Sequence, residues 1–269
     1  MPSHQSPEGR WHHTFSASWL KDFATCPEKA RRRYFGITPN KVTEYTALGS
    51  AVHAGIEFRL NGLLGGWETT LAGARVAAQE KLDQLWADPT YEPQKMNNDE
   101  QARLVNQHLG TFDRETLPHL KPLVAEEQFD LELYSDAFRT INIRGAIDCV
   151  DRNLGVIDWK TAGNPHKAWE KQRYEVQPTV YTWAWNKLQG THVDHMRYVV
   201  FIHDKGVQEY TVSRGPEHVE WLKYQAIAAA RQVESGLPVW TMNDSGWWCA
   251  AKWCPAYNAC KGSFIKEEK

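Results

Sequence analysis

The sequence lacks any long hydrophobic run, and this absence argues against a membrane-spanning protein. Its longest apolar stretches resemble residues 198–202, whereas a helix that crosses a bilayer needs about eighteen or more apolar residues. The polar segment MPSHQSPEGRWHH at the start of the sequence has no apolar core of the kind that defines a secretory signal. We therefore expect a soluble, cytoplasmic protein with no membrane partner.

A strong excess of charge of either sign is also missing. The 269 residues contain 31 Lys and Arg against 33 Asp and Glu, which gives a formal net charge of −2. This balance excludes a uniformly basic surface that coats duplex nucleic acid, but it allows a local basic groove. With 24% charged and 42% hydrophobic residues, the composition is that of a globular protein with a large core.

Cysteine is scarce and odd in number. The five cysteines are Cys26, Cys149, Cys249, Cys254 and Cys260. An odd count in an intracellular protein argues against a framework of disulfides and favours metal or redox chemistry. We expect Cys149 to lie in the core, because it alternates with Asp148 on a strand and so shares the isoleucine face.

Two abundant features each have a structural and a functional interpretation. The 13 tryptophans are typical of core packing, or of base stacking where a few rings are exposed. Residues 28–33 (EKARRR) carry four positive charges and one negative charge. They fit a solvated helix face and a patch that faces phosphates equally well.

Hydrophobic periodicity predicts an order of helices and strands that is typical of an α/β or α+β protein. The first helix is capped by Ser16 or Ser18 and interrupted at Pro27, and a second helix begins at Gly49 and Ser50. Later helices are expected at 173–188 and 218–236, and strands at 124–133, 140–152, 155–161 and 195–203.

These elements indicate a single domain over residues 14–262. Residues 1–13 are expected to form a mobile tail, and residues 263–269 form a second tail. Residues 67–120 are rich in helix and resemble a helical insertion, with breaks at Pro89 and Pro93.

The strands at 140–152 and 155–161 predict a hairpin that brings two carboxylates together. If the turn is centred on Asn153, Asp148 lies opposite Asp158, with Cβ atoms about 4.5–5.5 Å apart. A shift of one residue in the register would make the two residues diagonal neighbours instead. Because side chains alternate along a strand, Lys160 shares a face with Asp158.

Two carboxylates this close raise each other's pKa unless a cation lies between them. Mg²⁺ typically binds one or two carboxylates together with waters and phosphate oxygens. Beside such an ion, Lys160 can position or help to deprotonate a water and neutralise developing charge. A surface hairpin with an ordinary Asp–Lys pair is the alternative interpretation.

The hairpin motifs and four further segments, in this order, resemble the PD-(D/E)XK nuclease superfamily. More narrowly, residues 14 to 262 resemble the RecB-like exonucleases, including the CRISPR-associated and phage-encoded members that carry an iron–sulfur cluster. The matching segments are GAID at 145–148, VIDWK at 156–160, the serine and Cys-Pro segment at 15–27, LGSAVH at 48–53, QPTVY at 177–181 and the C-terminal cysteine trio.

The resemblance implies a restriction-endonuclease-like α/β core, in which helices flank a central mixed sheet. It implies that His53, Asp148 and Asp158 hold Mg²⁺ or Mn²⁺, and that Asp148, Asp158 and Lys160 are catalytic. Glu126 or Glu127 is a candidate for a further ligand, but strand alternation does not choose between them.

The resemblance also implies that Gln177 and Tyr181 contact the DNA strand near the scissile phosphate. The two residues are four apart and share a helical face. Pro178 is compatible with this placement only if Gln177 lies near the start of a helix.

For the cysteines, the resemblance implies that Cys26 and the trio hold a [4Fe–4S] cluster, with structural Zn²⁺ as the alternative. The trio has the spacing C-x4-C-x5-C, whereas C-x2-C-x5-C is usual in the family. Such a site would join the first helix to the C-terminal segment, and its binding energy would add to the folding energy.

The function implied is a Mg²⁺- or Mn²⁺-dependent DNA exonuclease that prefers single-stranded ends. The setting would be phage or prokaryotic recombination, repair or replication, in the host cytoplasm if the protein is phage-encoded. A recombination or single-strand-binding protein is a candidate partner. The alternatives are a catalytically silent module that binds DNA ends and an iron–sulfur redox sensor.

Overall fold

The computed structural model describes residues 3–38 and 41–263, and its contacts group into two compact units. The terminal unit comprises Met1–Asn40, Asp130–Gly145 and Pro216–Lys269, and the central unit comprises Lys41–Phe129 and Ala146–Gly215. The sequence predicts one domain here. The long strands β3 (Pro122–Ser135) and β4 (Arg139–Asp151) each contribute residues to both units.

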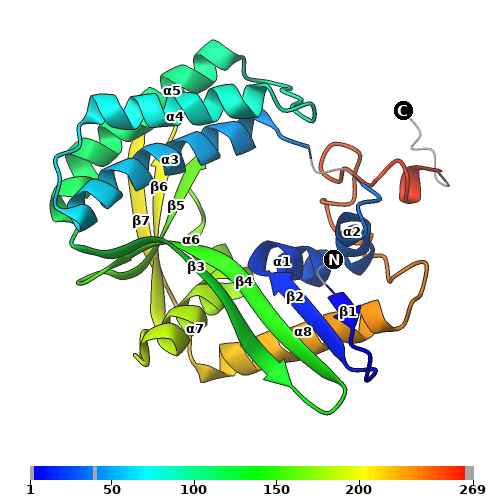
Figure 1. The fold of residues 1–269 in the computed structure, drawn as a ribbon. Coiled ribbons are helices and arrows are strands. Elements are labelled where there is room, and N and C mark those ends of the chain that lie inside the picture. Colours follow the sequence, from blue (N-terminus) through cyan, green and yellow to red (C-terminus); the bar gives the residue numbers. More distant parts are fainter. Residues whose placement is uncertain (1–2, 39–40, 264–269) are drawn as a thin grey trace. The chain divides into compact units, whose positions relative to one another are not determined.

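The terminal unit combines both ends of the described chain (Figure 1). In its sheet, β2 pairs antiparallel with β1 and parallel with the first half of β4. Ser16, one of the two candidate caps, accepts a hydrogen bond from Trp19 N, and Pro27 ends the first helix and starts a new one, as the sequence predicts. The elements are β1 (Ser3–Gln5), β2 (Trp11–Ser16), α1 (Ala17–Thr25), α2 (Pro27–Tyr34), α8 (Pro216–Glu234) and a short 3-10 helix (Lys261–Ser263).

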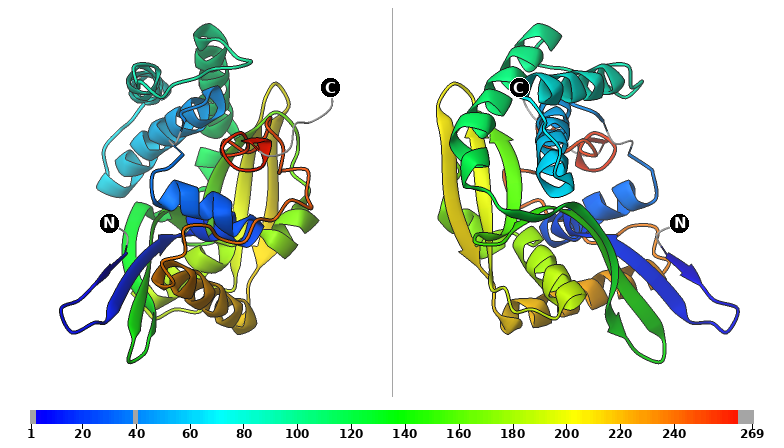
Figure 2. Two further views of the ribbon diagram at one scale, coloured as in Figure 1. Left: turned by 90° about the vertical axis from the view of Figure 1, so that its right-hand side faces the viewer. Right: turned by 60° about the vertical axis from the view of Figure 1, so that its left-hand side comes forward.

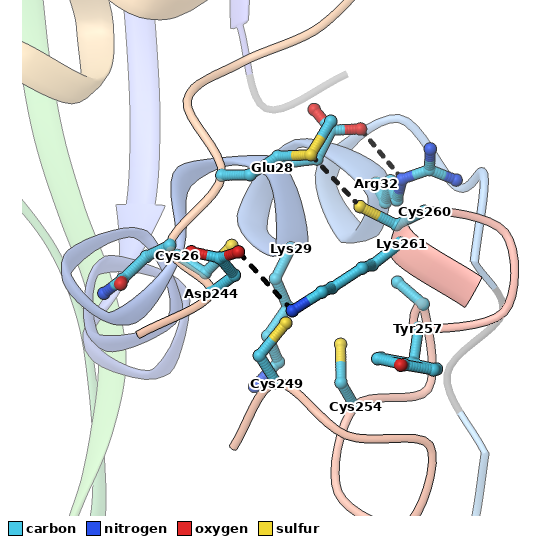
Figure 3. A pocket seen from close by; sticks show the side chains of 13 residues that line it. Cys26, Glu28, Lys29, Arg32, Asp244, Cys249, Cys254, Tyr257, Cys260 and Lys261 are labelled. Atoms are coloured by element: carbon cyan, nitrogen blue, oxygen red, sulfur yellow. Dashed lines mark hydrogen bonds and ion pairs between the residues drawn. The ribbon is translucent and has the colours of Figure 1, made fainter. Parts of the chain in front are cut away.

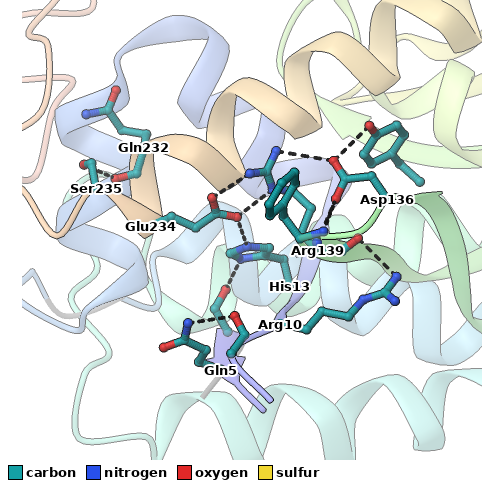
Figure 4. Close-up of polar contacts among 12 residues, drawn as sticks. Gln5, Arg10, His13, Asp136, Arg139, Gln232, Glu234 and Ser235 are labelled. Atoms are coloured by element: carbon teal, nitrogen blue, oxygen red, sulfur yellow. Dashed lines mark hydrogen bonds and ion pairs between the residues drawn. The ribbon is translucent and has the colours of Figure 1, made fainter. Parts of the chain in front are cut away.

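The expected tail over residues 1–13 does not hold for residues 3–13, which form a hairpin of β1 and β2. The reason is a buried polar network around His13 (Figure 4). The His13 Nε2–H donates to Glu234 Oε1 at 2.9 Å, and Nδ1 lies 2.6 Å from Ser3 Oγ. Arg139 donates to both oxygens of the same carboxylate, at 2.8 and 2.9 Å. The N-terminal segment is therefore an ordered hairpin despite its polar composition, because its polar side chains form hydrogen bonds.

Residues 1–2 of the expected N-terminal tail lie outside the described residues, and so do residues 264–269 of the C-terminal one.

The central unit packs three long helices on a mixed sheet (Figures 1 and 2). In this sheet the second half of β4 pairs antiparallel with β5, β5 pairs parallel with β6, and β6 pairs antiparallel with β7. The elements are α3 (Glu44–Gly65), α4 (Leu71–Trp86), α5 (Asn98–Thr111), two short turns (Phe112–Thr116 and Leu117–His119), β5 (Gly155–Ala162), α6 (Ala168–Tyr174), α7 (Gln177–Gln189), β6 (His195–Ile202) and β7 (Gly206–Ser213). The mixed α/β fold with helices flanking a mixed sheet agrees with the sequence prediction.

Alternation along β5 decides which side chains enter the core. Ile157 and Trp159 belong to the hydrophobic cluster that also contains residues of α3, α4 and α5. The residues that alternate with them, Asp158 and Lys160, therefore point to the opposite face of the sheet. This arrangement leaves the polar side chains of β5 together on one side.

Several elements of the central unit differ from the sequence prediction, among them α6, which is not predicted, and α7, which begins at Gln177 rather than at residue 173. Helix α3 begins at Glu44 rather than at Gly49, because Thr43 caps it by accepting a hydrogen bond from Thr46 N at 3.3 Å. Strand β7 is not predicted at all, since polar residues interrupt its apolar pattern. It exists because Asp204 (φ +58°) and Gly206 (φ +89°) turn the chain back so that β7 pairs with the whole of β6.

Within residues 3–38 and 41–263, no helix is both long and apolar enough to cross a membrane.

One histidine of α5 is buried in surroundings that disfavour its charged form. His108 is 1% exposed, and no hydrogen-bond partner for its Nε2 lies within the described residues. Its ring lies 5.3 Å from that of His203, centroid to centroid. Burial, and then the neighbouring His203, lower the pKa of His108 from 6.5 to about 4, although Asp204 acts in the opposite direction.

We expect His108 to make the protein less stable as the pH falls from about 6.5 to about 4. Over this range the unfolded chain protonates this histidine while the folded chain does not, so the free energy of unfolding falls by up to about 3 kcal/mol. Urea unfolding of the wild type and of His108→Gln at a series of pH values measures this difference. The exposed His119→Gln serves as the control. A wild type and a His108→Gln variant with the same pH dependence would contradict the prediction.

Candidate active site

The hairpin of β4 and β5 has the register that the sequence predicts. Three residue pairs define it: Cys149 with Ile157, Val150 with Val156, and Asp151 with Gly155. The turn is therefore centred on Asn153. The Asp151 carboxylate holds the turn by accepting hydrogen bonds from the backbone N–H groups of Asn153 (2.8 Å) and Leu154 (3.0 Å).

Asp148 lies one residue beyond these pairs, and its side chain contacts the backbone of β5. Its Oδ2 accepts a hydrogen bond from Trp159 N at 2.9 Å, and the residue is buried. The carboxylate is thereby fixed against β5. It lies close enough to Asp158 to raise the pKa of that carboxyl group.

Asp158 and Lys160 form a buried ion pair. Lys160 Nζ lies 2.5 Å from Asp158 Oδ2, and the aspartate side chain is fully buried. Burial raises the pKa of Asp158 to about 6, with Lys160 opposing this effect and Asp148 adding to it. The other oxygen, Oδ1, is buried and has no hydrogen-bond partner among the described residues. A buried carboxylate oxygen in this state is costly unless another donor or a cation reaches it.

His53 projects from α3 toward the same carboxylates. Its Nε2–H donates to the Trp159 carbonyl oxygen at 2.9 Å, because a carbonyl can only accept. Nδ1 therefore faces Asp148 Oδ2 at 3.7 Å and Glu126 Oε1 at 3.9 Å. Burial acts to lower the pKa of His53, but Asp148 and Glu126 outweigh it and raise the pKa to about 9.

The structure selects Glu126 from the two glutamates that alternation does not distinguish. Glu126 has φ +50°, which is rare for a residue that is not glycine. This left-handed residue interrupts the alternation of β3 and turns the Glu126 side chain toward His53. Such local strain is often found at functional sites. No local sequence pattern announces it, so sequence reasoning does not include Glu126 in the site.

The ligand atoms of His53, Glu126 and Asp148 all lie within 4.8 Å of one another. One imidazole nitrogen and two carboxylates form a donor set that suits Mg²⁺ or Mn²⁺. Asp158, a predicted ligand, instead lies against Lys160 and offers its unpartnered Oδ1. The residues present therefore fit a divalent cation.

Gln177 and Tyr181 lie on one face at the start of α7. Gln177 is the first residue of this helix and Pro178 follows it, which agrees with the condition set by the proline. The Gln177 amide donates to the Tyr181 hydroxyl at 3.0 Å. Burial raises the pKa of Tyr181, and the charges of Asp148 and Asp158 raise it further. The pair is therefore a neutral, hydrogen-bonded group beside the carboxylates.

The other predicted site residues gather in the terminal unit. Figure 3 shows the cavity of about 210 Å³ that the four cysteines line together with Lys29, Arg32 and Lys261. Burial raises the pKa of both Cys249 and Cys260, while Lys261 acts against this at the first thiol and Arg32 at the second. The fifth cysteine, Cys149, is fully buried in the core of the central unit, as predicted.

A buried carboxylate joins the two chain segments that carry these cysteines. Glu28, 1% exposed, accepts hydrogen bonds from Arg31 and Arg32 at 2.7–2.8 Å. It also accepts one from the backbone N–H of Trp240 at 2.9 Å. Helix α2 and the C-terminal segment are therefore connected by protein contacts alone.

We expect Glu126→Gln to weaken the binding of Mn²⁺ by about tenfold or more, because the site loses one of its two anionic oxygen ligands. Glu127→Gln is the matched control, since it makes the same chemical change at the adjacent residue. Isothermal titration of each folded variant with Mn²⁺ measures the dissociation constant. Equal weakening by both substitutions would show that net charge, and not coordination, governs binding.

A family model of the PD-(D/E)XK nuclease superfamily matches residues 14–261, whereas no curated protein sequence matches. A solved structure of a candidate exonuclease from Eubacterium rectale has 12% identity and a TM-score of 0.54, and the match covers 95% of this chain and 90% of that one. This similarity supports the fold alone.

An alkaline exonuclease from Laribacter hongkongensis is similar at 13% identity, with a TM-score of 0.33 and coverage of 76% of this chain and 93% of that one. The family model spans nearly the whole described chain, and it includes every residue of the candidate site. The protein therefore belongs to the PD-(D/E)XK nuclease superfamily.

Proposed function

We propose that this protein is a Mg²⁺- or Mn²⁺-dependent DNA exonuclease that hydrolyses phosphodiester bonds. The observation that carries the proposal is the meeting of His53, Glu126 and Asp148 beside the Asp158–Lys160 ion pair. Membership of a nuclease superfamily supports it. An arrangement of buried carboxylates this costly is typical of a site that does chemistry.

In this proposal, His53 Nδ1, Glu126 and Asp148 hold the cation, and Asp158 Oδ1 is available as a further ligand. When bound, the ion would polarise the phosphoryl group and make a water more acidic. The hydrogen bonds from Trp159 N to Asp148 and from His53 Nε2 to Trp159 O orient two of the ligands in advance. Such outer contacts set the tautomer and direction of metal ligands.

Lys160 acts through its charge. Burial acts to lower the pKa of Lys160, but Asp158 and Asp148 outweigh it and raise the pKa. A lysine that stays protonated is a poor base, so its ammonium group stabilises the negative charge that develops on the phosphate oxygens during attack by water. It also holds Asp158 in position.

Gln177 and Tyr181 are proposed to contact the DNA strand near the scissile phosphate. Their amide and phenol groups are both able to donate to phosphate oxygens, and they lie beside the carboxylates on the face of α7. Contacts of this kind position a strand without reading its sequence.

The finer assignments rest on the sequence motifs. On this basis we propose a RecB-like exonuclease of the iron–sulfur type that prefers single-stranded ends. We also propose a role in phage or prokaryotic DNA recombination, repair or replication in the cytoplasm, with a recombination or single-strand-binding partner.

The four cysteines are proposed to hold a [4Fe–4S] cluster. The four thiols line a common cavity in the terminal unit. Four thiolates can hold a [4Fe–4S] cluster or a structural Zn²⁺, and the preference for the cluster comes from the resemblance of the motifs. Lys29, Arg32 and Lys261 line the same cavity, and their charges would stabilise thiolates.

We expect the folded wild type to cleave end-labelled DNA in Mg²⁺ or Mn²⁺ and not in EDTA. Asp158→Ala should lower cleavage by about a hundredfold or more, since it removes a ligand and the partner of Lys160. Glu127→Gln should cleave as the wild type does. Comparing single-stranded with duplex substrates tests strand preference, and the position of the label reveals the direction of digestion. Cleavage unchanged by Asp158→Ala would contradict the proposal.

For the cluster, we expect the protein purified without oxygen to contain iron and acid-labile sulfide and to absorb visible light. Cys254→Ser should lose the bound metal and lower the thermal stability, because binding energy at such a site adds to folding energy. Cys149→Ser, at the buried thiol of the central unit, should keep the metal. Zinc in place of iron would overturn the cluster in favour of a Zn²⁺ site.

A further inference from the structure

Two tryptophans of the terminal unit turn their rings to solvent. Trp247 is 71% exposed and Trp253 is 53% exposed, although burial of a large apolar ring would stabilise the fold. They lie six residues apart, on either side of Cys249. Neither residue takes part in the candidate active site.

The two rings are held in a fixed arrangement. Trp247 packs edge to face against Trp253, with ring centroids 5.4 Å apart and an interplanar angle of 86°. On its other flank Trp247 meets Trp248, at 6.0 Å and 71°. Gly246 allows this packing, because a Cβ there would lie 2.2 Å from the Trp248 ring. In an edge-to-face pair one ring presents its edge to one face of the other, so the pair covers only one of its own four ring faces and can stack on another flat group through the rest.

Positive charge accompanies the rings. Lys252 Nζ lies 4.6 Å from the centroid of the Trp253 ring. The segment from 247 to 261, WWCAAKWCPAYNACK, contains two lysines and no acidic residue. The cations that line the nearby cavity are ion-paired: Lys29 with Asp22, Arg32 with Glu28 and Lys261 with Asp244. Lys252 is therefore the cation on which the charge of this surface depends. The partner that this surface favours is therefore flat and carries negative charge.

We propose that Trp247, Lys252 and Trp253 form a platform on which bases of single-stranded DNA stack, an inference that rests on the proposed nuclease function. The tryptophan faces would stack on bases and the lysine would pair with phosphates, the two interactions that bind single strands regardless of sequence. Duplex DNA does not fit, because its base faces are already stacked on each other. The ammonium group of Lys252, at the ring of Trp253, favours a nucleic acid over an apolar protein surface.

The test measures binding of a dye-labelled oligothymidine by fluorescence anisotropy in EDTA, which stops cleavage. Trp253→Leu and Trp247→Leu should each weaken binding by about tenfold, since one stacked base contributes about 1–3 kcal/mol. Trp253→Phe should restore most of the affinity, because it keeps an aromatic ring. Trp221→Leu is the matched control: this ring on α8 is 54% exposed and should bind DNA as the wild type does.

A second oligomer with the same phosphates and no bases separates stacking from charge. The leucine variants should bind it as tightly as the wild type does, whereas Lys252→Ala should weaken the binding of both oligomers and reduce the salt dependence. Thermal unfolding checks that each variant is folded. If a leucine variant does not fold, Trp253→Phe and Lys252→Ala still test the platform.

Two outcomes would overturn the proposal. One is a folded pair of leucine variants that bind oligothymidine as the wild type does, which would leave the exposed rings to a protein partner. The other is equal weakening with and without bases. Cleavage in Mg²⁺ is measured on the same preparations, so a wild type that cleaves DNA while the platform variants bind normally refutes the platform alone. A wild type that neither cleaves nor binds DNA refutes the proposed function.

Discussion

The backbone of Trp159 is the constraint on which the candidate active site depends. Its N–H donates to Asp148 and its carbonyl accepts from His53, so a single residue orients a strand ligand and a helix ligand. Its side chain is 1% exposed and packs edge to face on Phe112, with centroids 5.7 Å apart. Packing of the indole ring in the core thereby holds the backbone of Trp159, and with it both hydrogen bonds, in place. Asp158 and Lys160 flank Trp159 and point to the opposite face of the sheet from its ring, so strand geometry completes the arrangement.

The site brings several carboxylates together, and positive charges nearby offset their mutual repulsion. Ligand atoms of Glu126 and Asp148 lie within 4.8 Å of each other, and the charge of Asp148 raises the pKa of Asp158. Lys160 and the protonated His53 supply two positive charges within the same site. In the proposed function, a bound cation would take over this role, and the histidine would have to release its proton to coordinate. One form of charge balance would then replace another.

How far sequence reasoning reaches depends on the range of the interaction. The register of the β4–β5 hairpin is predicted correctly, because a short turn and strand alternation are local rules. Glu126 is not distinguished from Glu127, since no local rule predicts the one left-handed residue in β3. The N-terminal hairpin is missed for another reason: Glu234, which secures His13, lies 221 residues away in the sequence. The roles of Gln177, Tyr181 and the cysteines come from motif order, and they stay predictions.

The carboxylate of Glu28 has a consequence for how the chain is made. Its contact with Trp240 joins residues 212 positions apart, and a ribosome adds roughly 5–20 residues per second. Helix α2 therefore leaves the ribosome about 10 to 40 s before its distant partner does. Arg31 and Arg32 lie on the same helix and reach the carboxylate without help from the rest of the chain. During synthesis, the Glu28 carboxylate is therefore paired with Arg31 and Arg32 before it is buried. It becomes buried only after the segment that contains Trp240 has been synthesised.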